Sequence, residues 1–97
     1  MLGGETVELP IVSATGAPTG TTALSLNIAV TEPEGPGYLT VYPCNATMPL
    51  AANLNFAAGQ TTSNHVTATV SDDGRICVFA SRATQVVVDV EGIYRQG

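Results

Sequence analysis

The chain has 97 residues, of which 44% are hydrophobic and 11% are charged. This length predicts one small domain, and the hydropathy and low charge exclude an intrinsically disordered chain. A formal net charge of −5, with only three basic residues, excludes proteins that bind nucleic acid or anionic membranes through clustered Lys and Arg. Lysine is absent, which also excludes Schiff-base chemistry and Lys–Asn isopeptide cross-links.

Apolar residues alternate with a period of two along most of the chain, as in half-buried β-strands. β-Branched residues dominate these runs, and no window of helical length carries an apolar stripe. We therefore predict no helix and about seven strands. In chain order, the predicted strands cover residues 7–12, 22–31, 38–43, 52–57, 64–71, 75–81 and 84–92.

Gly, Pro and Asp mark the turns between these strands. Residues 12–22 read as a polar connection, and residues 31–37, TEPEGPG, as a long turn. The run SDDGR, residues 71–75, predicts a β-hairpin in which Gly74 takes a positive φ. Together the pattern predicts an all-β, antiparallel β-sandwich, Ig-like or jelly-roll-like. Open edge strands in such a sheet would also allow a homo-oligomer.

The two cysteines, Cys44 and Cys77, have the same parity on two predicted strands, opposite to the aliphatic side chains. A structural zinc site needs four ligands, and the chain offers one His beside two Cys. A catalytic thiol would need a neighbouring base and would leave the other cysteine unexplained. We therefore predict a Cys44–Cys77 disulfide and an oxidising compartment, extracellular or at the cell surface.

Several motifs between Ala23 and Tyr94 occur together in a known kind of domain. They are PGYLTV at 36–41, PC at 43–44, NLNF at 53–56, AGQ at 58–60, ICVF at 76–79 and TQVVVDVEGIY at 84–94. This segment resembles an all-β accessory domain that recurs, often in tandem, in secreted and cell-surface proteins of actinobacteria. His65 departs from the pattern, where an aliphatic residue is more typical. The resemblance implies an extracellular all-β accessory domain, with no settled activity and no catalytic residues to carry over. We predict that residues 1–97 are a single domain, excised from a longer extracellular protein.

Polar residues that could carry chemistry each have a simpler interpretation. No nucleophile elbow accompanies His65, so we interpret it as a partly exposed strand residue and expect no enzyme. Four turn acids could chelate calcium, but we interpret them as solvated and expect no metal or cofactor: Glu32, Glu34, Asp72 and Asp73. Asn45-Ala46-Thr47 matches a glycosylation sequon only by pattern.

Two functions remain open from the sequence. The first is a module that binds a polysaccharide or cell-wall glycan, without nucleic acid binding or membrane insertion. Its candidate ligand residues are predicted to share the non-aliphatic face, with one at the preceding turn: Tyr38, Tyr42, Asn53, Asn55, Phe79 and Asp89. The second is a structural spacer or assembly domain that binds no small ligand. Exposed aromatic rings on one sheet would favour binding, and rings buried around the disulfide would favour the spacer.

Overall fold

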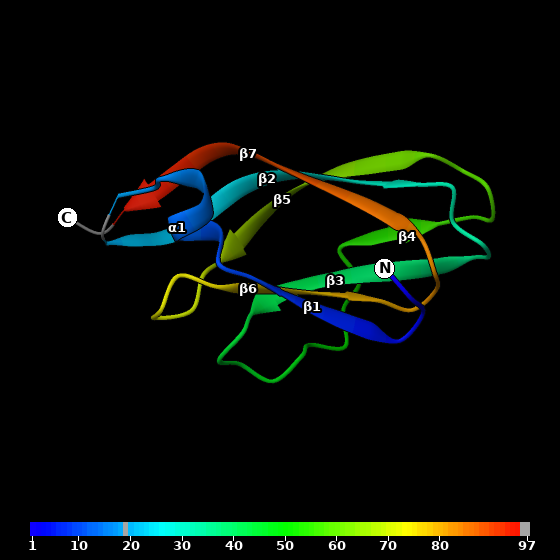
Figure 1. Ribbon diagram of the computed structural model, residues 1–97, viewed down its shortest axis with the longest axis horizontal. Helices are drawn as coiled ribbons and strands as arrows, with labels where there is room; N and C mark the ends of the chain where they lie inside the picture. The colour runs from blue at the N-terminus through cyan, green and yellow to red at the C-terminus, as the bar shows by residue number, and fades with distance from the viewer. Residues whose placement is uncertain (19, 96–97) are drawn as a thin grey trace.

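The computed structural model describes residues 1–18 and 20–95 (Figure 1). The described elements are β1 (Glu5–Leu9), α1 (Ile11–Thr15), β2 (Thr21–Thr31), β3 (Gly37–Pro43), β4 (Leu54–Phe56), β5 (Thr62–Thr69), β6 (Ile76–Ala80) and β7 (Gln85–Arg95). Sheet A has the strand order β1-β6-β3-β4, and sheet B has the order β5-β2-β7. All of their pairings are antiparallel. The predicted antiparallel all-β fold is therefore confirmed.

The aliphatic side chains of the two sheets face each other and form the core. Alternate residues of β2, from Leu24 to Val30, are fully buried, and the residues between them are partly exposed. Sheet A contributes Leu39, Ile76 and Val78 from its own alternating strands. Figure 1 shows β7, β2 and β5 as one layer above β3, β6 and β1. The period-two pattern thus places the aliphatic residues inside and leaves each sheet one outer face.

The predicted hairpin at residues 71–75 is a turn between sheets. Gly74 has the expected positive φ, at 77°, and its N–H donates to the carbonyl of Ser71. However, β5 belongs to sheet B and β6 to sheet A, so the two strands do not pair. The prediction of a hairpin was wrong because turn residues report a chain reversal but do not specify the sheet that the next strand joins.

The first strand ends earlier than predicted, and a short helix follows it. β1 ends at Leu9, because Pro10 has no N–H for the β-ladder. The helix α1 buries Ile11 and ends at Gly16, which is in the left-handed region with φ 70°. The five-residue helix is too short for an apolar stripe, so periodicity gave no signal for it.

Candidate binding faces and the disulfide

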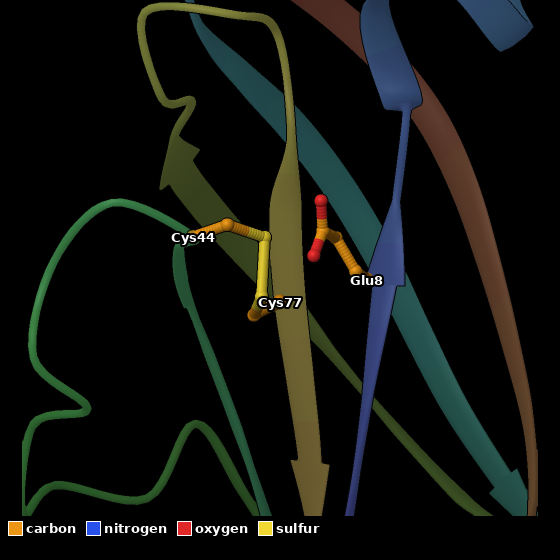
Figure 2. Close-up of side chains that lie close together, drawn as sticks. All are labelled: Glu8, Cys44 and Cys77. Atoms are coloured by element: carbon orange, nitrogen blue, oxygen red, sulfur yellow. A yellow bond between two sulfur atoms is a disulfide. The ribbon is translucent and has the colours of Figure 1, made fainter.

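The disulfide predicted from the sequence is present. Cys44 follows β3, and Cys77 lies on the neighbouring strand β6, with 5.0 Å between their Cα atoms (Figure 2). Cys77 is buried, and its partner is half-buried on the outer side of sheet A. A disulfide of this kind is maintained in an oxidising environment, which supports that part of the predicted localisation.

An acidic side chain lies beside the two sulfur atoms. Glu8 of β1 is directly opposite Cys77 in the strand register, and one of its carboxylate oxygens lies within 4.8 Å of both sulfurs (Figure 2). The same carboxylate pairs with the Arg75 guanidinium, and this hydrogen bond raises the pKa of Arg75, with a smaller contribution from the charge of Asp73. Among residues 1–18 and 20–95, this is the one cluster of three potential metal ligands, but the disulfide bond occupies both sulfurs.

Four of the six predicted ligand residues lie together on the outer face of sheet A. We call Tyr38, Tyr42, Asn55 and Phe79 the aromatic face. The rings of Tyr38 and Phe79 form a tilted pair with centroids 5.8 Å apart. Asn55 is exposed and directly opposite Tyr38, whereas Tyr42 is half-buried opposite Cys77. The structure therefore brings these side chains onto one surface.

Asn53 has a structural role beside this face. Its side-chain Oδ1 accepts a hydrogen bond from the Val41 N–H at 2.7 Å, and its own N–H donates to the Leu39 carbonyl at 2.8 Å. Its carbonyl accepts a bond from the Asn64 side chain of sheet B at 2.8 Å. Asn53 thus extends the β3–β4 pairing and ties the two sheets together, and its Oδ1 is engaged by the backbone.

Asp89 lies on the other side of the molecule. It belongs to β7, where it is exposed and directly opposite Asn27 of β2. Its alternation with half-buried Val88 and Val90 places it on the outer face of sheet B. The six predicted residues therefore do not form a single surface.

The outer face of sheet B carries a constellation that we did not predict. His65 of β5 hydrogen-bonds the Ser25 hydroxyl of β2 through Nε2, at 2.6 Å. Its Nδ1 lies 2.8 Å from a carboxylate oxygen of Glu91 on β7. The sequence signal was Gly92, because a glycine inside a strand often marks a β-bulge that redirects a neighbouring side chain.

The turn acids do not come together. Asp72 and Asp73 border a hollow beside Gly20 and Thr21, at the start of the eleven-residue strand β2, whereas Glu32 follows its end. Asp73 is paired with Arg75 at 3.2 Å. These two acidic turns therefore cannot share one calcium ion.

A polar surface hollow lies apart from both the aromatic face and the Ser25, His65 and Glu91 side chains. It has a volume of about 590 Å³ and lies at the end of the sandwich where β2 begins. Its lining is rich in hydroxyl groups and contains no aromatic ring: Gly20, Thr21, Thr22, Thr69, Val70, Ser71 and Asp72. None of the predicted ligand residues borders it.

Within the described part of the chain, no helix is long and apolar enough to cross a membrane. Comparisons with protein-family models, with curated proteins and with solved structures found no match for this chain.

Proposed function

We propose that this chain is an extracellular accessory domain that binds a neutral polysaccharide or cell-envelope glycan through the aromatic face of sheet A. The disulfide supports the extracellular setting, because such bonds persist in oxidising compartments. Binding rather than catalysis is the main role that we assign to the domain.

The observation that carries this proposal is the Tyr38–Phe79 ring pair on an outer sheet face. Tyr38 is 38% exposed, and Phe79 is half-buried between Thr6 of β1 and Thr40 of β3 in the strand register. Apolar ring faces can stack on sugar rings, and the exposed Asn55 amide beside Tyr38 can exchange hydrogen bonds with hydroxyl groups.

The electrostatics of this face suit an uncharged ligand. Its one strongly acidic group near the disulfide, Glu8, is paired with Arg75, so their opposite charges offset each other. The aromatic face itself consists of Tyr, Asn and Phe side chains and contains no Asp, Glu, Lys or Arg. A neutral glycan therefore meets no isolated charge that it would have to desolvate.

A spacer or assembly domain is the second candidate, and a specific observation favours it. Tyr42 is half-buried and lies directly opposite Cys77 in the strand register, so it is a neighbour of the disulfide on this face. Thr40, between Tyr38 and Tyr42 on β3, is 1% exposed, and its hydroxyl donates to the Ala51 carbonyl at 3.1 Å. The segment around Ala51 therefore covers part of the face and shortens the accessible aromatic row.

A pull-down on insoluble polysaccharides and isolated actinobacterial cell walls tests the proposal. The variants are Tyr38→Ala and Asn55→Ala, and the matched control is Tyr94→Ala, which removes an aromatic ring that is 51% exposed on β7 of sheet B. We expect wild type and the control to be retained and Tyr38→Ala to be released, with unchanged circular dichroism. No retention of the wild type on any matrix would reject glycan binding and favour the spacer.

A further inference from the structure

We propose that Ser25 is an activated nucleophile that is acylated by carboxylic esters, with His65 as its general base and Glu91 as the residue that positions the imidazole. This activity goes beyond the proposed glycan binding and is located on the opposite face of the molecule. It rests on three side chains that come from the three different strands of sheet B.

Both ring nitrogens of His65 have the partners that such a function requires. Nε2 lies 2.6 Å from the Ser25 hydroxyl oxygen, and Nδ1 lies 2.8 Å from the Glu91 carboxylate. An ionised carboxylate can only accept, so Nδ1 must carry the proton that it donates to Glu91. In the neutral ring Nε2 is then the acceptor, and the Ser25 hydroxyl donates to it. This is the polarity in which an imidazole removes a serine proton.

A β-bulge in β7 builds this arrangement. Ser25 is opposite Gly92 and Leu26 is opposite Val90, so Glu91 is an extra residue without a partner in the β2–β7 register. A bulge redirects the side chain of the extra residue, and here the Glu91 carboxylate reaches His65 on the far strand of the sheet.

Gly92 keeps the space beside the nucleophile open. A Cβ atom added at Gly92 would lie 3.4 Å from the Ser25 Cβ, in van der Waals contact with it, so the glycine leaves this space unoccupied. The His65 and Glu91 side chains are 58% and 49% exposed. Ser25 is half-buried and lies on the solvent-facing side of sheet B, from which we expect an ester to approach it.

The chemical step is an acyl transfer. As the Ser25 oxygen bonds to the ester carbonyl carbon, its proton moves to Nε2 of His65, and the carbon–oxygen bond to the leaving alcohol then breaks. Nε2 returns the proton to the leaving oxygen, which gives an acyl-serine and a neutral alcohol. Thr67 lies directly opposite Ser25 on β5 and offers an exposed hydroxyl that can donate to the carbonyl oxygen. Because the site is open, we expect substrates with exposed acyl esters.

The test is site-resolved labelling of the folded wild-type protein with a fluorophosphonate and with p-nitrophenyl acetate, followed by peptide mass spectrometry. Ser63 is the internal control, because it is an exposed serine on β5 at the same face. We expect Ser25 to be labelled about 100-fold faster than Ser63, the order of magnitude of general-base assistance. His65→Gln should abolish this advantage, and unfolding in urea should remove it in the wild type.

Glu91 is tested by a readout that a purely structural contact would not change. In wild type, nitrogen NMR should find His65 as the tautomer protonated at Nδ1. Glu91→Gln should reduce Ser25 labelling about tenfold and shift this tautomer balance, with an unchanged circular dichroism spectrum. Equal labelling of Ser25 and Ser63 in the folded wild type would overturn the proposal, and the trio would then be only a polar clip across sheet B. The glycan pull-down would be unaffected by that result.

Discussion

Removal of the Cys44–Cys77 disulfide is the sharpest test of the stability that we derive from this fold. The bond closes a loop of 33 positions between the end of β3 and β6. The chain-entropy model converts this loop into about 3.7 kcal/mol of stabilisation, through the restriction of the unfolded chain. A domain of this size has a total stability of about 5–15 kcal/mol, so the bond supplies a large fraction of it.

The variant Cys44→Ala with Cys77→Ala should therefore be much less stable than the oxidised wild type. We expect a loss of about 3–5 kcal/mol, since buried Cys77 also loses the contacts of its sulfur. At roughly 4–8 °C per kcal/mol for a chain of this length, Tm should fall by about 12–40 °C. Urea unfolding followed by far-UV circular dichroism, and thermal scans of the same samples, measure both quantities.

Reduced wild-type protein is the matched control, because it lacks the bond but keeps both sulfur atoms. If the reasoning is correct, it should unfold close to the double-alanine variant and with a larger m-value than the oxidised protein, since its unfolded state is less restricted. A loss below about 1 kcal/mol in both samples would refute the loop argument. It would mean that the β3–β6 pairing already restricts the same part of the unfolded chain.

Three further predictions concern single side chains. Leu26→Ala should lower the free energy of unfolding, measured with urea, by about 2–5 kcal/mol, because loss of this fully buried side chain leaves a cavity between the sheets. A decrease below about 1 kcal/mol would contradict the packing. Gly74→Ala should lower the free energy of unfolding in the same assay by more than about 1 kcal/mol, because φ at this residue is 77° and the new Cβ would lie 2.8 Å from the Val12 Cβ. Glu8→Gln should speed reduction by dithiothreitol about three- to fivefold at low salt, because the Arg75 guanidinium that Glu8 neutralises near the sulfurs would then attract the attacking thiolate. Equal rates at low salt would exclude this attraction.

The strands could be predicted from the sequence because each has its own period-two pattern. The aliphatic residues of β2 from Leu24 to Val30 are all buried, as expected for a half-buried strand. The disulfide could be predicted because Cys44 and Cys77 have the same parity on their strands and the chain has too few other ligands for a zinc site. Both facts can be read from the sequence without knowledge of the strand order. In contrast, α1 was missed because Pro10 and Gly16 bound a segment too short for helical periodicity.

The location of a residue on one sheet or the other could not be predicted from the pattern. Parity states that Tyr42 and Asp89 both point away from the core, and this is correct for both residues. A sandwich, however, has two outer faces, and strand order decides which of them a residue occupies. A β5–β6 hairpin would have placed both strands in one sheet. Instead β5 and β7 belong to sheet B and β6 belongs to sheet A. Asp89 therefore lies away from the aromatic residues with which it was grouped.

The constellation of Ser25, His65 and Glu91 depends on a β-bulge, a place where the period-two alternation of β7 fails. In a regular antiparallel strand after Val90, residue 91 would face outward and residue 92 inward. The register instead places Gly92 opposite outward-facing Ser25, so residues 91 and 92 both lie on the outer side of sheet B. Restoring a regular register would require Glu91 to pair in place of Gly92 opposite Ser25, and its carboxylate would then compete with His65 for the serine hydroxyl. The bulge is thus what separates the acid from the nucleophile by one imidazole ring.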